Sequence, residues 1–142
     1  MRPAHRPGTR RWLLLPAAFL ILSGLMAAGC SSSKPAYCTD AANLKTSVQN
    51  LGNVDVAKNG LSSLQTALTS VKTNAASFAT DAQSAYPSQI AALNTSLSAL
   101  QTAITSAKGQ PPVTAAAAVV SAVTQVKNSA SALQSAASGK CQ

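Results

Sequence analysis

Large apolar residues recur at alternating intervals of three and four positions along most of the chain after residue 40, with Ser, Thr, Asn and Gln between them. This spacing is typical of the buried face of an amphipathic helix. Four such seams can be followed: Leu44, Val48 and Leu51; Leu61, Leu64, Leu68, Val71, Ala75, Phe78 and Ala82; Ile90, Leu93, Leu97, Leu100, Ile104 and Ala107; and Ala116, Val119, Val123, Val126, Ala130, Leu133 and Ala137. No segment alternates with a period of two, so the pattern predicts helices and no strands.

Capping and breaking residues indicate where these helices begin and end. We expect Thr39 or Asp40 to cap the first helix, Gly52 to close it, Asp55 to cap the second, Pro112 to occupy the first turn of the last, and Gly139 to stop it. Short connections between amphipathic helices favour antiparallel neighbours. The sequence therefore predicts an all-α fold, an antiparallel bundle of four helices.

Pro87 leaves an alternative open. Proline is favoured in the first turn of a helix and disfavoured inside one, which suggests that a third helix starts here after a tight turn at residues 84–86. Phe78, Ala82, Tyr86 and Ile90 nevertheless stay on one helical face. A three-helix fold with a long middle helix kinked at Pro87 is the second possibility.

The segment before these seams has a different character. Residues 1–11 carry four Arg, and residues 12–28 form an apolar run that ends in small residues, as in an export signal. A retained membrane helix is the alternative, but about 17 residues is the lower limit for spanning, and Pro16, Ser23 and Gly24 interrupt the run. We expect residues 1–29 to be a signal peptide that is removed, with the rest of the chain exported.

The end of this segment, Ala27-Ala28-Gly29-Cys30, resembles the lipobox of bacterial lipoproteins, although Ala27 stands where that pattern usually has Leu. The resemblance implies that Cys30 carries lipid, palmitate included, and that residues 30–38 are a polar tether. Ordinary cleavage after Gly29, with secretion and a free Cys30 thiol, is the alternative.

The cysteine count favours lipidation. The chain has three cysteines, Cys30, Cys38 and Cys141, and an odd number in an exported protein leaves one to explain. Lipidation of Cys30 would leave Cys38 and Cys141 as a pair that flanks the predicted bundle domain, residues 39–142. An even number of alternating helices places both at the same end, so we expect a disulfide that serves folding rather than redox chemistry.

Side chains that carry catalysis are scarce after residue 30. That region contains no His, Glu, Arg, Trp or Met, and its carboxylate side chains are Asp40, Asp55 and Asp81. The first two suit helix N-termini and the third a solvated face. No metal-binding or phosphate-binding motif is present. We expect no enzyme activity, no metal site and no cofactor.

The charges after residue 30 are seven Lys and three Asp, a formal charge of +4. The lysines are scattered singly, without the Arg and stacking aromatic residues typical of nucleic-acid binding, so we expect no nucleic-acid partner. Lys34, beside the predicted anchor, could attract anionic lipid head groups. The uncharged Ser/Thr/Asn/Gln faces have three possible explanations: they reflect composition, they carry Ser/Thr glycosylation near the tether, or they pack against another chain.

With its signal, its lipobox-like end, the segment 53–60 and Cys141, the chain resembles the uncharacterised small secreted helical proteins of actinobacteria. That resemblance implies a source and a fold but no activity. We therefore expect a lipid-anchored, extracytoplasmic bundle at the cell envelope with a non-catalytic structural or protein-interaction role, binding an envelope protein or a second copy. The alternative is a binding lipoprotein that holds a small apolar ligand between its helices.

Overall fold

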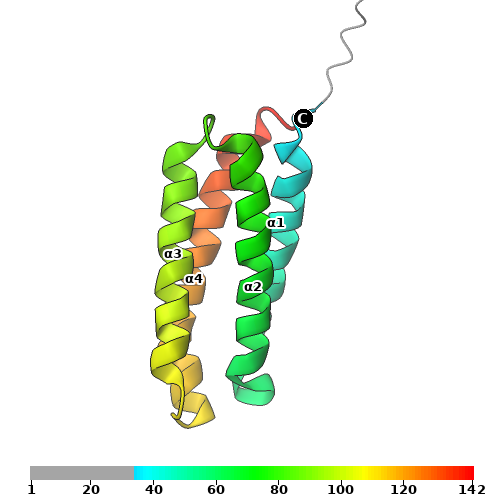
Figure 1. The fold of residues 1–142 in the computed structure, drawn as a ribbon. Coiled ribbons are helices and arrows are strands. Elements are labelled where there is room, and N and C mark those ends of the chain that lie inside the picture. Colours follow the sequence, from blue (N-terminus) through cyan, green and yellow to red (C-terminus); the bar gives the residue numbers. More distant parts are fainter. Residues whose placement is uncertain (1–33) are drawn as a thin grey trace, which may run out of the picture. The chain divides into compact units, whose positions relative to one another are not determined.

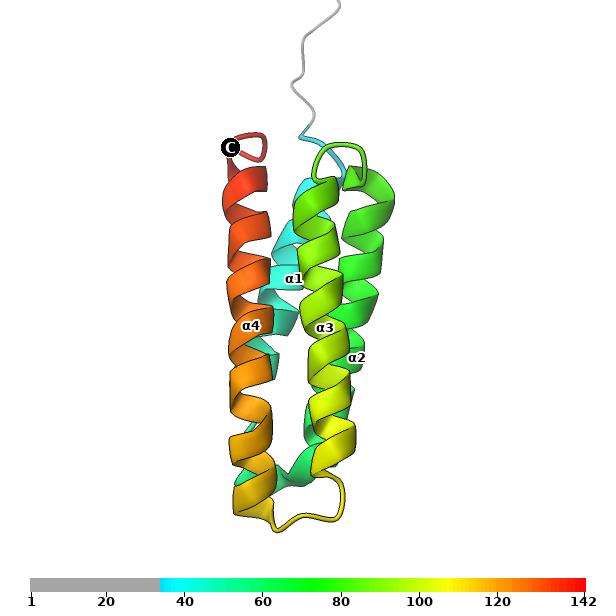
Figure 2. The ribbon, with the colours of Figure 1, turned by 90° about the vertical axis from the view of Figure 1, so that its left-hand side faces the viewer.

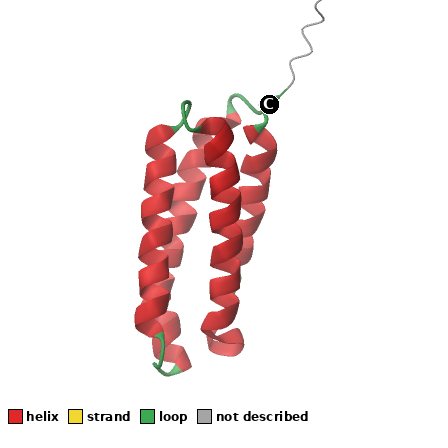
Figure 3. Ribbon diagram, viewed as in Figure 1, coloured by secondary structure: helices red, strands yellow, loops and turns green. Residues whose placement is uncertain are grey.

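The computed structural model describes residues 34–142 of the chain. They form four helices, α1 (Tyr37–Gly52), α2 (Val56–Ala82), α3 (Pro87–Ala107) and α4 (Pro112–Ser138) (Figure 1). Loops join these helices, and this part of the chain contains no strand (Figure 3). The predicted all-α bundle of four helices is confirmed. The signal peptide and the lipid-carrying Cys30, both expected from the sequence, lie outside the described residues.

The four helices run alternately up and down, each packing against the next, and α4 packs back against α1 (Figures 1 and 2). The pairs α1/α2 and α3/α4 pack most extensively, whereas α2 and α3 contact each other less. The connections are short, as antiparallel neighbours require.

The predicted seams meet along the bundle axis and form one core. Its largest fully buried side chains are Phe78, Leu44, Leu51, Leu64, Leu68, Leu93, Leu100, Ile104, Leu133, Val71, Val119 and Val126. Two serines, Ser47 and Ser96, are also buried, and each hydroxyl donates to a carbonyl of its own helix, Leu44 O at 2.9 Å and Leu93 O at 2.8 Å. Their polar groups are therefore satisfied without a partner from another helix.

The buried face of α4 differs from the predicted seam at two positions. Ala115 and Ala122 are the deeply buried residues, 2% and 7% exposed, while Ala116 and Val123 are only partly buried. The predicted seam contained Val123 because it has a larger side chain than Ala122. The structure buries Ala122 instead. Small residues allow two packed helices to approach closely, and α4 packs extensively on α3.

The helices begin and end near the predicted capping and breaking residues, except at the start of α1. Pro87 occupies the first turn of α3, so the separate-helix interpretation is confirmed and the long kinked helix is wrong. Neither Thr39 nor Asp40 caps α1. That helix begins at Tyr37, with Ala36 as its N-cap residue and no side-chain cap.

A break inside α2 was not predicted. Gly60 has φ 74° and ψ 174°, a conformation that is essentially restricted to glycine, and it separates a short first turn from the long helix that follows. Asp55 caps that short turn, accepting a hydrogen bond from the backbone N–H of Lys58. The predicted cap is therefore correct, and the seam from Leu61 onward belongs to the helix after the break.

A disulfide joins Cys38, at the start of α1, to Cys141, just after α4, with the two Cα atoms 5.5 Å apart. The predicted pairing and its position at one end of the bundle are confirmed. None of the helices within residues 34–142 is both long and apolar enough to cross a membrane.

Candidate functional site

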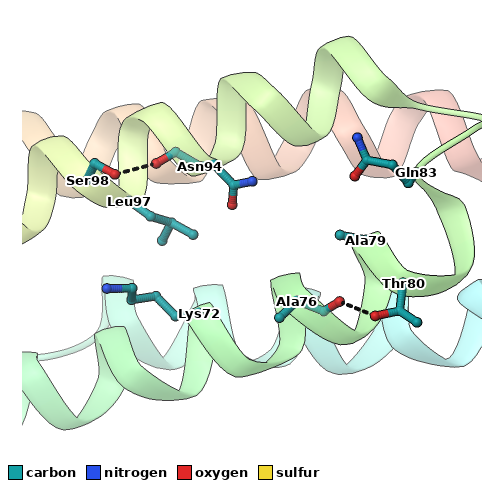
Figure 4. A pocket seen from close by; sticks show the side chains of 8 residues that line it. All are labelled: Lys72, Ala76, Ala79, Thr80, Gln83, Asn94, Leu97 and Ser98. Atoms are coloured by element: carbon teal, nitrogen blue, oxygen red, sulfur yellow. Dashed lines mark hydrogen bonds between the residues drawn. The ribbon is translucent and has the colours of Figure 1, made fainter.

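A groove of about 590 Å³ runs between α2 and α3. Of the helix pairs that follow each other in sequence, α2 and α3 contact each other least, and small side chains on α2 widen the groove between them. Its lining residues, shown in Figure 4, are Lys72, Ala76, Ala79, Thr80, Gln83, Asn94, Leu97 and Ser98. The sequence patterns did not indicate this groove, because most of its residues lie beside the apolar seams rather than on them.

The polar side chains of the groove are almost all uncharged. Thr80 donates its hydroxyl proton to Ala76 O and Ser98 donates its own to Asn94 O, both at 3.0 Å (Figure 4). These hydroxyl oxygens keep lone pairs that can accept a hydrogen bond, while the amides of Gln83 and Asn94 can both donate and accept. The groove therefore offers hydrogen bonds over a floor of alanine and leucine.

Lys72 is the one ionisable side chain in the lining, and it has no ion-pair partner within residues 34–142. The groove lining contains no carboxylate, imidazole or thiol beside this ammonium group.

A second feature lies at the disulfide end, where three aromatic rings from three parts of the chain meet. The Tyr37 ring packs edge-on against Phe78 and Tyr86, with centroid distances of 5.8 and 5.6 Å. The hydroxyl groups of Tyr37 and Tyr86 are 3.4 Å apart. This contact with Tyr37, together with burial, raises the pKa of Tyr86 above its usual value of 10.0. The aromatic cluster anchors both the start of α1 and the loop between α2 and α3.

The three predicted carboxylates occupy separate places. Asp40 lies in the first turn of α1, Asp81 is exposed near the end of α2, and Asp55 caps the short turn at the other end of the bundle. Asp55 also forms an ion pair with Lys58 at 3.3 Å. The hydrogen bond from the Lys58 backbone N–H, followed by the contact with the Lys58 side chain, lowers the pKa of Asp55 below 3.8.

The described residues were also compared with the side-chain clusters that bind metal ions. Within residues 34–142, no three His, Cys, Asp or Glu side chains come together as a metal ion would need. Cys38 and Cys141 are joined to each other, and Cys30 lies outside the described residues.

No protein-family model matches the chain, and no curated protein or solved structure is significantly similar to it. The resemblances drawn from residues 27–30 and 53–60 therefore remain predictions. The function has to be argued from the chain's own residues.

Proposed function

We propose that this protein is a lipid-anchored bundle on the extracytoplasmic face of a bacterial cell membrane, with a non-catalytic structural or protein-interaction role. The proposal combines the basic, apolar and small-residue parts of segment 1–30 with the folded domain that follows.

The observation that carries it is the pairing of Cys38 with Cys141. Of the chain's three cysteines, this pairing leaves Cys30 as the unpaired one, and Cys30 is the residue that ends the lipobox-like Ala27–Cys30 sequence. A structural disulfide also favours an oxidising compartment, since cytosolic proteins rarely keep one. Both arguments support export and acylation of Cys30.

The position of the disulfide supports the same arrangement. Residues 30–37 can span at most about 25 Å when fully extended. A lipid on Cys30 would therefore hold the disulfide end, with its aromatic cluster of Tyr37, Phe78 and Tyr86, close to the membrane. The opposite end, at residues 53–60 and 108–112, would point away from it.

The anchor is tested by fractionating cells that express the full chain and by labelling them with an alkyne fatty acid. We expect the wild-type protein in the membrane fraction with label, and the Cys30→Ala variant without label and out of that fraction. Ser32→Ala is the matched control and should behave as wild type. Equal labelling of the Cys30→Ala variant would contradict the anchor.

The role of the folded domain is tested separately, by native mass spectrometry of the purified chain. A chain free of bound small molecules is the expected result. A co-purified apolar ligand would replace the structural or interaction role with that of a binding lipoprotein.

A further inference from the structure

The outer face of α4 carries the two strongly exposed large apolar side chains of residues 34–142. Val113 is 76% exposed and Val120 is 60% exposed. They lie seven residues apart, so both point to one side of the helix, together with Ala117 and Thr124. We name these four residues the valine face. All other exposed helix faces of the described chain present small, polar or charged side chains.

A hollow of about 300 Å³ lies directly beside the valine face and shares Val120 and Thr124 with it. Its other lining residues include Gly52, Val54, Asp55, Ala116, Val123 and Lys127. Most of this lining is apolar, and the charged side chains Asp55 and Lys127 are exposed.

The hollow follows from the unequal lengths of the helices. α1 has 16 residues and ends at Gly52, whereas α4 has 27, so the first turns of α4 extend beyond the end of α1 (Figure 2). The segment that leads into α2 covers this gap only in part, which leaves Val54, Ala116 and Val123 partly buried.

We propose that the valine face and this hollow form the interface of a symmetric dimer of the chain. An exposed apolar side chain next to an apolar hollow is self-complementary, because a two-fold axis between them places Val120 of each copy over the hollow of the other. The proposal names the partner for the interaction role proposed above and rests on that role.

Charge supports a second copy over a uniformly charged partner. The hollow carries a carboxylate, Asp55, which pairs with the exposed Lys58 ammonium group at 3.3 Å, and a second ammonium group, Lys127, so its rim bears both signs. Under a two-fold axis each sign can face the opposite one, whereas a uniformly charged partner would meet a like charge. The aliphatic part of the exposed Lys127 side chain passes close to Gly52, where an added Cβ would stand 3.3 Å from the Lys127 Cδ.

The contact is small. From Val113 to Thr124 the valine face covers about 16 Å of helix, at 1.5 Å per residue. An interface of this length falls at the low end of specific association. Dimerisation is therefore weak for freely diffusing chains and is favoured when anchoring concentrates them on one membrane.

The test places a photo-crosslinking amino acid at position 120 of the full chain in cells, with position 102 on the exposed face of α3 as control. The expected product is a species of twice the chain mass, formed from position 120 only and containing peptides of this chain alone. A cross-link to another protein, or no product from position 120, would overturn the dimer.

Sedimentation of the purified full chain gives the quantitative result. The double variant Val113→Lys/Val120→Lys should weaken dimerisation roughly tenfold or more, because it removes apolar burial and places like charges together. Ala118→Lys/Gln125→Lys is the matched control, with the same helix, spacing and added charge, and should dimerise as wild type. Equal dissociation constants for both variants would contradict the interface.

The mass of the same preparation separates this inference from the proposed anchor. A lipidated chain that stays monomeric at every concentration would contradict the dimer and agree with the proposed anchor. A chain without lipid that still dimerises through position 120 would contradict the anchor and agree with the dimer.

Discussion

Asp55 stabilises the start of α2 through its carboxylate, which accepts a hydrogen bond from the Lys58 N–H. Because folding lowers the pKa of Asp55, this stabilisation is present above pH 3.8 and is lost as the pH falls through the folded-state pKa. We expect Asp55→Ala to lower the melting temperature by roughly a few degrees at neutral pH, and by less near pH 2. Thermal melts at both pH values measure the effect.

The matched control is Asp81→Ala, which removes an exposed carboxylate from the last turn of the same helix. Its melting temperature should stay near that of the wild type, since a negative charge there receives no help from the helix dipole. An Asp55→Ala deficit that is equally large in acid would contradict the role of the charge.

For Tyr86 we expect the opposite pH dependence. Its pKa is raised in the folded protein, so folding favours the neutral phenol. Its contribution to the free energy of unfolding is therefore present below pH 10 and is lost as the pH rises through the higher folded-state pKa. The wild type should lose more stability than Tyr86→Phe between about pH 8 and pH 11. Urea unfolding at the two pH values compares them, and parallel losses would argue against the Tyr37–Tyr86 contact.

Single residues were predictable where their local chemistry acts alone. The cap at Asp55 and the helix start at Pro87 depend on side-chain chemistry within one turn, and both were predicted correctly. Either Thr39 or Asp40 was expected to cap α1, but the helix begins earlier, at Tyr37, whose ring packs on Phe78 and Tyr86 from distant parts of the chain. A tertiary contact of this kind leaves no local signal in the sequence.

Among the helices, α2 offers the sharpest test because of the break at Gly60. A Cβ at this position meets no neighbouring atom, but φ is 74°, so Gly60→Ala introduces backbone strain without a steric clash. We expect a loss of about 1–3 kcal/mol in the free energy of unfolding. Urea denaturation measures it.

Gly139→Ala is the matched control for this substitution. A Cβ at Gly139 also meets no neighbouring atom, but its φ is −64°, which alanine adopts readily. This variant should be unchanged or more stable by about 0.4–1 kcal/mol. If the two variants lose the same stability, the break at Gly60 does not depend on glycine.

The helices themselves were predictable because their apolar seams repeat over many turns. The exact face of α4 was not, because residues 115–118 are all alanine and the pattern offers no contrast between neighbours. The groove between α2 and α3 and the hollow beside α4 were also missed. Both result from helix lengths and from how closely pairs of helices pack, which spacing along one helix does not encode.

Across the whole domain, the Cys38–Cys141 disulfide links residues 103 positions apart in sequence. A cross-link of this length removes much of the freedom of the unfolded chain, worth roughly 4.7 kcal/mol in the chain-entropy model. The double variant Cys38→Ser/Cys141→Ser should therefore lose about 2–5 kcal/mol of stability, a large share for a small domain. Urea unfolding measures the loss, and an unchanged midpoint would show that the bond is not needed for stability.

The pairing of these cysteines was predictable because parity and helix number both pointed to it. Three cysteines leave one unpaired, and four alternating helices return the chain to its starting end. The exposure of Val113 and Val120 was not predictable to the same degree, because both residues stand in a run of apolar residues that also supplies the core.

The measurement to make first is the intact mass of the full chain from the membrane fraction, alkylated with and without prior reduction. We predict a chain that begins at Cys30, carries a diacylglycerol group, and gains two alkyl groups only after reduction. An unmodified chain recovered from the medium, with Cys30 alkylated before reduction, would contradict the anchor. It would also make Cys30 a free thiol in a secreted protein.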